Sequence, residues 1–337
     1  MKKINIYIDS ACDVLYSSFY IKGLEECFGF SNLFFRNKPF RRFKFNNHYF
    51  AFIIEEELSR INVVIDYSDS SEVSKVALDW CDIYYKINID EEKDYNSNKI
   101  LSIGPSFGIK IFSFYQTFFL AFSNYFKSFG RIKISDTRRF FSNYKAQYKR
   151  PTIYDYFPGT VQENYLYFVG SLWKKEPKTN MYRANFIKAC LSLNIKFEGG
   201  FAPRIKNDIR GFEGLTMNSR DKIESYIKKT KLSIATFNTP AVLDCHGWKL
   251  AEFLCFGKAI ISTKLTRKLP LDLLDNEHLL YTDGSQEDIK EKLEFLIENK
   301  KVREKLEKNA RGYFENELSP QKVVQKILFR IDQLINI

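Results

Sequence analysis

The chain has no apolar run long enough to cross a membrane, although 45% of its 337 residues are hydrophobic. Its first residues are basic and pass directly into a strand-like pattern. They lack the apolar segment and the small-residue cleavage site of a signal peptide. These absences predict a protein that is not exported, so we expect it in the cytoplasm.

Closely spaced metal ligands are also missing. The three histidines are spread along the chain, and none of the six cysteines forms a Cys-x-x-Cys pair. Disulfide frameworks and zinc sites require closely spaced cysteine or histidine. No Asp-x-Asp metal motif is present either. We therefore expect reduced, mostly buried thiols and no bound metal.

Acidic residues are scarce in one region. Between residues 106 and 150, nine lysines and arginines accompany a single acid, Asp136, so this stretch has a net charge of +8. Its first part, 106–129, is a helix-like run rich in Phe and Tyr. Within that run, aromatic residues at helical spacing indicate a buried face. They occupy positions 115, 118, 122, 126 and 129.

Three interpretations of this stretch remain open. The first is an ordinary core helix. The second is a helix whose edge faces a membrane, with basic side chains that contact anionic lipid. The third is nucleic-acid binding, for which no accompanying motif is present. We expect peripheral contact with the inner face of a membrane through 106–150 and no nucleic-acid partner.

Strand-like and helix-like runs alternate along the whole chain. This alternation predicts an α/β protein with mostly parallel sheets. Ser219 is expected to cap a helix over 219–229. Ser319-Pro320 is a cap-then-proline signal that predicts the start of a last helix. The predicted parts are a first domain at 1–150, a linker at 151–163, a second domain at 164–317 and a closing helix at 318–337.

The most informative stretch is 241–263, Ala-Val-Leu-Asp-Cys-His-Gly-Trp-Lys-Leu-Ala-Glu-Phe-Leu-Cys-Phe-Gly-Lys-Ala-Ile-Ile-Ser-Thr. A loop with one carboxylate, Asp244, leads through Gly247 into a helix-like run that contains Glu252. A glycine at a helix start lets backbone amides approach a bound anion, and the helix dipole favours negative charge there. The stretch therefore predicts a site for a phosphorylated ligand.

The two acids are eight positions apart, and Gly257-Lys258 ends the helix-like run. With Gly247, this pattern resembles the E-x(7)-E signature of GT-B glycosyltransferases, and the likeness extends over 165–334. The resemblance implies a GT-B fold, which has two Rossmann-like domains facing across a cleft and a C-terminal helix crossing back to the first domain.

The resemblance also implies an activity. A GT-B enzyme of this kind moves a sugar from a nucleotide-sugar donor, here expected to be UDP- or GDP-linked, to a hydroxyl of the acceptor. The bacterial members that it resembles act in capsule or lipopolysaccharide biosynthesis, so a cell-envelope glycan or a lipid-linked molecule is the expected acceptor. The transfer is expected to retain the sugar's configuration and to need neither a cofactor nor a metal.

The resemblance assigns roles to three residues of the motif. Glu252 is expected to bind the ribose hydroxyls of the donor. Asp244 takes the position of the first acid, near the transferred sugar, with a side chain one methylene shorter than Glu. His246 stands where the family usually has an aromatic residue and is expected to hydrogen-bond to the sugar or phosphate.

Further residues are expected at the diphosphate. Gly247, Trp248 and Lys249 open the helix-like run, and Lys249 adds positive charge one turn inside it. The family usually contributes an Arg and a Lys from the first loop of this domain. That loop here has Ser171 in place of the Arg, with lysines shifted by one or two positions. The shifted lysines are Lys174 and Lys175, and Arg204 or Lys206 could supply the missing charge. The alternative is that either loop is plain solvated basic surface.

The first domain contains candidate bases. Asp66 and Asp69 follow a strong strand-like run, where open α/β sheets place their ligands. Either residue is a candidate general base for an inverting version of the transfer, although such acids more often cap the next helix. Asp9 occupies the same position after the first strand. A catalytically silent GT-B-like scaffold is the alternative from another functional class.

Overall fold

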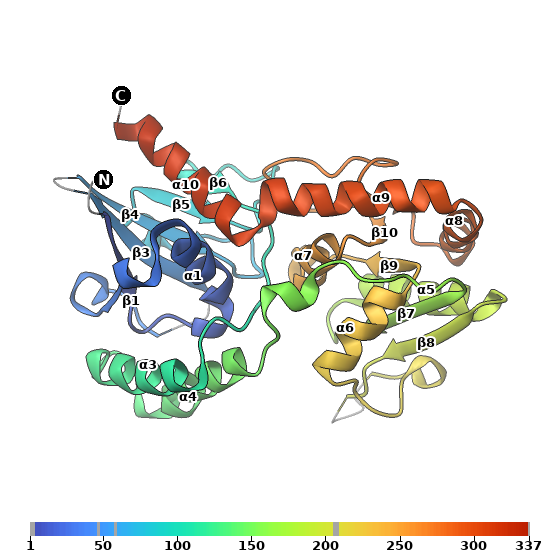
Figure 1. Ribbon diagram of the computed structural model, residues 1–337, viewed down its shortest axis with the longest axis horizontal. Coiled ribbons are helices and arrows are strands. Elements are labelled where there is room, and N and C mark those ends of the chain that lie inside the picture. The colour runs from blue at the N-terminus through green and yellow to red at the C-terminus, as the bar shows by residue number, and fades with distance from the viewer. Residues whose placement is uncertain (1–3, 46–47, 57–58, 205–208, 336–337) are drawn as a thin grey trace. The chain divides into compact units, whose positions relative to one another are not determined.

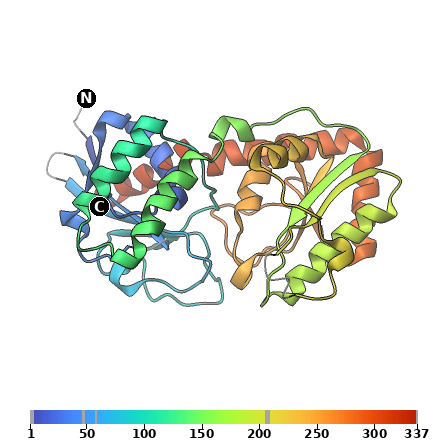
Figure 2. The same cartoon turned by 90° about the horizontal axis from the view of Figure 1, so that it is seen from below.

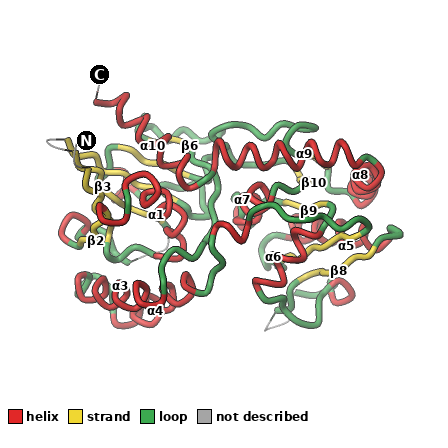
Figure 3. Tube along the Cα trace, in the orientation of Figure 1, coloured by secondary structure: helices red, strands yellow, loops and turns green. Residues whose placement is uncertain are grey.

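A computed structural model describes residues 4–45, 48–56, 59–204 and 209–335 (Figure 1). The chain divides into two compact units, and each combines helices with a sheet (Figure 3). This confirms the α/β class predicted from the alternation of elements. Unit 1 comprises Met1–Ile153, Lys268–Pro270 and Glu317–Ile337, and unit 2 comprises Tyr154–Arg267 and Leu271–Asn316.

Unit 1 contains a six-stranded sheet in the order β2-β1-β3-β4-β5-β6. Three neighbouring pairs are parallel, and β3 is antiparallel to both of its neighbours. β3 ends only a few residues before β4 begins, and such a short connection can join only antiparallel strands. The strands are β1 (Ile4–Asp9), β2 (Leu33–Arg36), β3 (Tyr49–Glu56), β4 (Ser59–Asp66), β5 (Ile83–Lys86) and β6 (Ile100–Ser102).

The last helix of the chain packs on the first one within unit 1. A Cβ added at Gly23 would lie 2.1 Å from the carbonyl oxygen of Pro320, so only glycine permits this approach. The last helix begins at Pro320, as the sequence predicted. The helices of unit 1 are α1 (Val14–Phe28), α2 (Lys75–Leu78), α3 (Phe114–Lys127), α4 (Ile134–Tyr148) and α10 (Pro320–Ile335).

The predicted start of a helix at residue 106 was wrong. Residues 103–113 form no regular element, and α3 begins only after Ser113. Ser113 and Gln116 form a capping box, which marks a helix start more strongly than apolar spacing does. Upstream, the backbone is held by other partners, because Ile109 N donates to Ser18 Oγ at 3.0 Å.

Unit 2 contains parallel strands only, among those that the structure describes. β8 pairs with β7, and β9, β10 and β11 form a second group in the order β11-β10-β9. Ile234 N donates to Tyr165 O at 2.9 Å, which links the segment entering β9 to β7. The strands are β7 (Tyr165–Gly170), β8 (Lys196–Phe201), β9 (Ala235–Asn238), β10 (Ala259–Thr263) and β11 (Leu280–Thr282).

The helices of unit 2 cover these strands around an aromatic core, in which the Phe186 and Phe237 rings stack 4.6 Å apart. Ser219 does not cap a helix, because the helix there begins at Ile223 after Lys222. The helices are α5 (Pro177–Ser192), α6 (Ile223–Leu232), α7 (Trp248–Phe256), α8 (Gln286–Glu298) and α9 (Lys300–Tyr313). No helix within the described residues is long and apolar enough to cross a membrane.

Candidate functional site: a cationic pocket at the start of α7

The loop and helix predicted from 241–263 are present in unit 2. α7 begins at Trp248 with Gly247 as its N-cap residue, and Gly257 ends it in the left-handed conformation with φ 60°. Glycine is the usual residue for such a helix end. Because Gly247 has no side chain to cap the helix, the first amides of α7 remain suited to an anionic ligand.

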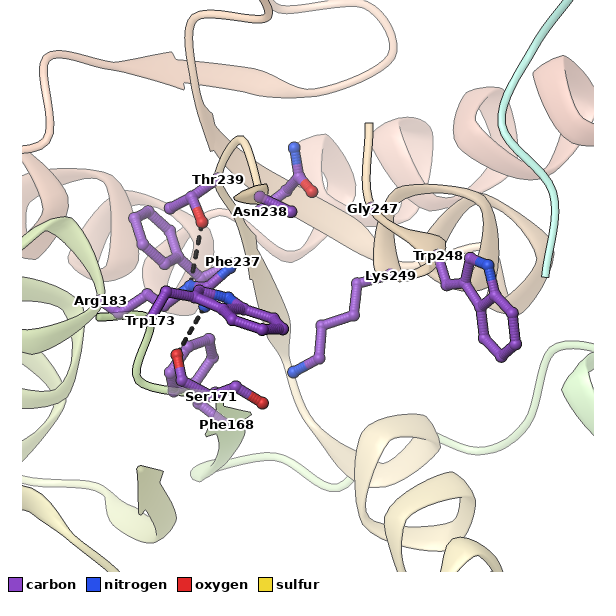
Figure 4. A pocket seen from close by; sticks show the side chains of 12 residues that line it. Phe168, Ser171, Trp173, Arg183, Phe237, Asn238, Thr239, Gly247, Trp248 and Lys249 are labelled. Carbon is purple, nitrogen blue, oxygen red and sulfur yellow. Dashed lines mark hydrogen bonds between the residues drawn. The ribbon is translucent and has the colours of Figure 1, made fainter. Parts of the chain in front are cut away.

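A pocket of about 160 Å³ opens in front of this helix start (Figure 4). Whole small-molecule ligands occupy pockets of roughly 300–1,000 Å³. The pocket therefore suits one part of a ligand better than a complete nucleotide sugar. Its lining residues come from β7, β9, α5, α7 and the adjoining loops: Phe168, Gly170, Ser171, Trp173, Arg183, Phe237, Asn238, Thr239, Ala241, Gly247, Trp248 and Lys249.

Arg183 reaches the pocket from α5 and is only 9% exposed. Its Nη1 donates to Ser171 O at 2.7 Å and its Nε donates to Thr239 Oγ1 at 3.0 Å (Figure 4). Both acceptors are uncharged. Burial lowers the pKa of Arg183 to about 10, so the guanidinium stays charged at neutral pH.

Lys249 reaches the pocket from the first turn of α7. Its Nζ donates to Val169 O and lies 5.2 Å from the centre of the Phe168 ring. Burial and then the charge of Arg183 lower the pKa of Lys249 to about 7. A bound anion would oppose both effects, since it favours the charged ammonium.

The pocket thus combines two cationic side chains, each bonded to uncharged oxygens, with the amino end of a helix. This combination can hold a phosphate or diphosphate and stabilise negative charge that develops on it. Among the residues that the structure describes, no group of three metal-ligating side chains could hold a metal ion. The chemistry that the pocket residues offer is anion binding by amides, Arg183 and Lys249.

Four of the expected donor-site residues lie together at this pocket: Ser171, Gly247, Trp248 and Lys249. The ring of Trp248 points away from Arg183 and Lys249, so it borders the pocket rather than filling it (Figure 4).

The other loop cations lie elsewhere. Lys174 and Lys175 are exposed and do not line the pocket. Arg204 donates from Nη1 to Leu172 O at 2.7 Å and lines a separate pocket. Lys206 lies outside the described residues.

Glu252 is buried one turn after Lys249 and is 4% exposed. Tyr226 Oη donates to Glu252 Oε2 at 2.7 Å. Burial, and then the charge of Glu252, raise the pKa of Tyr226 well above its ordinary value. Glu252 is not among the residues that line the pocket.

Asp244 and His246 occupy contrasting environments. Asp244 is exposed and has φ 59°, and the preceding Leu243 has φ 55°. Non-glycine residues at positive φ are uncommon, and such strain is often found at functional loops. His246 is buried with Nε2 3.0 Å from Arg267 O, and burial lowers its pKa to about 4. The imidazole is therefore neutral and must donate from Nε2 to this carbonyl.

The candidate bases of unit 1 differ in how their carboxylates are engaged. Asp66 is buried and accepts hydrogen bonds from Tyr84 Oη at 2.5 Å, Lys86 Nζ at 3.1 Å and Ser68. These partners hold Asp66 in a structural role at the end of β4. Asp69 is exposed three residues later.

Asp9 is buried at the end of β1, where both of its oxygens accept from Arg131 at 2.8 Å. Arg131 belongs to the basic region 106–150. Because it pairs with Asp9, its charge is neutralised and does not add to the positive charge of the surface. Burial raises the pKa of Asp9 despite its ion pair.

Arg183 is the charged residue of the pocket that the sequence did not predict. It lies in a helix far from the motif, so no local pattern joins it to Gly247. One sequence feature could have identified Arg183. It shares one side of α5 with Asn180, Ala184 and Ile187, which are all buried. An arginine at an inward position of an amphipathic helix needs a partner or a ligand.

No protein-family model matches the sequence, and no curated protein matches it. Similar folds do occur among solved structures. The C-terminal domain of a group 1 glycosyl transferase (LpcC) from Francisella tularensis is 14% identical with a TM-score of 0.35; the match covers 49% of this chain and 96% of that domain.

Two longer proteins are similar to this chain. TarM from S. aureus, in complex with fondaparinux, alpha-GlcNAc-glycerol and UDP, is 11% identical with a TM-score of 0.45 over 78% of this chain and 47% of that one. Sucrose-phosphate synthase from Thermosynechococcus elongatus is 10% identical with a TM-score of 0.42; the match covers 80% of this chain and 64% of that one. This chain therefore spans less than two thirds of either protein. At these TM-scores, the likenesses assign no function by themselves.

Proposed function

We propose that this protein is a glycosyltransferase that holds the diphosphate of a nucleotide-sugar donor in the pocket at the start of α7. The observation that carries the proposal is the pairing of Arg183 and Lys249 there, both bonded to uncharged oxygens. Two cations whose hydrogen bonds go to uncharged oxygens suit a doubly charged ligand. The donor is UDP- or GDP-linked in this proposal.

The same residues would assist the chemical step. When the bond between the sugar and the diphosphate breaks, negative charge grows on the departing phosphate oxygen. Arg183, Lys249 and the amides at Gly247 would stabilise this charge without a metal ion. Glu252 would orient the nucleotide through its ribose, and the strained loop at Asp244 would lie beside the sugar.

The stereochemistry is part of the proposal. We favour retention, with Asp244 and His246 near the transferred sugar. Because His246 is neutral and buried, its role would be hydrogen bonding rather than proton transfer. An inverting mechanism remains the alternative, and its base would be Asp69, since the carboxylate of Asp66 is already occupied.

A cell-envelope glycan or a lipid-linked molecule is the acceptor that we propose, as in capsule or lipopolysaccharide biosynthesis. The reaction would take place in the cytoplasm at the inner face of the membrane. NMR of the product anomer would distinguish retention from inversion.

The donor proposal is tested by thermal shift and calorimetry with UDP, GDP and CMP, followed by their sugar conjugates. We expect one nucleotide family to bind and Glu252→Ala to weaken it. Absence of binding to every nucleotide and nucleotide sugar would contradict the donor site and favour a catalytically silent scaffold.

A further inference from the structure

Helix α3 has its large apolar side chains on the outside. Its buried positions hold the small or polar residues Thr117, Ala121 and Asn124. Asn124 Nδ2 donates to Tyr144 Oη of α4 at 2.9 Å, which fixes this inward face. The outward face consists of exposed aromatic side chains: Tyr115, Phe118, Phe119, Phe122 and Phe126. The interpretation of this stripe as an ordinary core face, one of the three that the sequence left open, is therefore wrong.

The five outward aromatic residues form one continuous strip. At 3.6 residues per turn they fall within an arc of about 100°. The Phe118 and Phe122 rings lie 4.7 Å apart, so neighbours along the strip touch. Phe129, just beyond the helix, is also exposed. With 14 residues, α3 is shorter than the roughly 20 residues that cross a bilayer.

Helix α4 adds positive charge beside this strip. Arg138, Lys145 and Lys149 are exposed at spacings that place them on one side of the helix. The Phe122 ring lies 5.2 Å from Phe141 of α4, so the aromatic strip borders this helix. Figure 2 shows α3 and α4 side by side in green.

We propose that this α3–α4 face docks on a bilayer with anionic headgroups. It is formed by the five aromatic residues of α3, by Arg138 and Lys145 of α4, and by Lys149 at the C-cap of α4. The aromatic side chains would enter the boundary between headgroups and acyl chains, and the cations would contact the phosphates. A second copy of the chain is a poor occupant, because pairing the face with itself would oppose two stretches that each have a net charge of +8.

The test is co-sedimentation of the whole protein with vesicles of phosphatidylcholine, alone or mixed with phosphatidylglycerol. The wild type is expected to pellet with the mixed vesicles only, and less at high salt. Phe126→Ser is expected to weaken binding roughly tenfold, through lost apolar contact. Phe329→Ser is the matched control: Phe329 is 66% exposed on α10 and Phe126 is 68% exposed. The control is expected to bind like the wild type.

A charge series tests the other half of the face. Arg138→Gln/Lys145→Gln/Lys149→Gln is expected to lose affinity by about fivefold per cation. The matched control removes three exposed lysines from α9 and should bind normally: Lys301→Gln/Lys305→Gln/Lys308→Gln.

Four results would overturn the docking surface, of which three concern vesicles and self-association. These are equal binding to neutral vesicles, equal losses in the test and control variants, or a dimer that Phe126→Ser dissolves in a protein that binds no vesicle. RNA binding lost in the same variants, without vesicle binding, would also reject it. None of these residues lines the cationic pocket, so the variants should bind nucleotide like the wild type. Loss of vesicle binding with normal nucleotide binding therefore concerns the docking surface alone and not the donor site.

Discussion

At the scale of single residues, the hydrogen bonds of Arg183 and Lys249 go to carbonyl and hydroxyl oxygens. Arg303, by contrast, is buried and pairs with Glu163 at 2.8 Å. A buried cation without a carboxylate is a cost in free energy that a bound anion can offset.

Arg183→Met should therefore separate ligand binding from stability. We expect the affinity for the preferred nucleotide to fall about 10- to 100-fold, because a charge-assisted hydrogen bond is worth roughly 1.5–3 kcal/mol. The free energy of unfolding should change by less than about 1 kcal/mol, since the lost bonds and the relieved burial of charge oppose each other.

Calorimetry and urea denaturation measure the two quantities. The control is Arg303→Met, which should lower stability and leave nucleotide affinity unchanged. If Arg183→Met is strongly destabilising and its folded fraction binds nucleotide normally, Arg183 is a structural residue.

Lys249 should make stability depend on pH. Its pKa is about 7 in the folded protein against an ordinary value of 10.5. Between these values the unfolded chain binds more protons, so stability rises with pH by up to about 1.4 kcal/mol per unit. We expect Lys249→Met to show a smaller rise from pH 7 to 9 in urea denaturation, whereas Lys301→Met should match the wild type. Equal slopes in all three proteins would contradict the lowered pKa.

Residues of the pocket differed in how far the sequence could identify them. Gly247 and Lys249 were predictable because both are local to the start of one helix. Arg183 was not, because it meets them only after α5 packs beside β9. The hydrogen bonds to Asp66 could not be predicted from the sequence either, since their donors Tyr84 and Lys86 come from the neighbouring strand.

At the scale of elements, the errors of the sequence prediction lie at the starts of helices. Apolar and aromatic spacing extended a helix back to residue 106, whereas the hydrogen bonds begin it after Ser113. The alternation of strands and helices was predicted correctly, since most strands are short apolar runs. The spacing of aromatic residues did not reveal which side of α3 faces the protein. That side is fixed by contacts with other elements, such as the hydrogen bond from Asn124 to Tyr144 of α4.

The capping box predicts a measurable asymmetry in α3. Ser113→Ala removes the side-chain acceptor for Gln116 N and should cost about 1 kcal/mol of stability. Ser123→Ala, at an exposed position in the same helix, should be neutral or slightly stabilising, because alanine is the better helix former. Thermal denaturation compares the two. Equal effects would contradict this account of the helix start.

At the scale of the whole molecule, each unit has its own hydrophobic core and its own tryptophan residues. Trp80 belongs to unit 1, whereas Trp173 and Trp248 belong to unit 2. The pocket lies entirely in unit 2, and the contact between α1 and α10 lies entirely in unit 1. Changes to either should therefore act on one unit at a time.

Gly23→Val should destabilise unit 1 selectively, because its side chain would collide with the backbone at Pro320. Calorimetry should show a lower transition temperature for unit 1 and an unchanged one for unit 2. A nucleotide at 100 times its dissociation constant should stabilise unit 2 by about 2.7 kcal/mol and leave unit 1 unchanged. One common shift of both transitions would mean that the units unfold together.

The place of α10 has a consequence for synthesis on the ribosome. Unit 1 starts at the first residue, yet the helix that covers α1 is made from Pro320 onward. Domains made first usually fold first, but here unit 2 has all of its residues by Asn316 while unit 1 still lacks its last helix. The nascent chain must therefore keep the Gly23 side of α1 uncovered through most of translation, and a ribosome that stalls late would leave the earliest part of the protein unfinished.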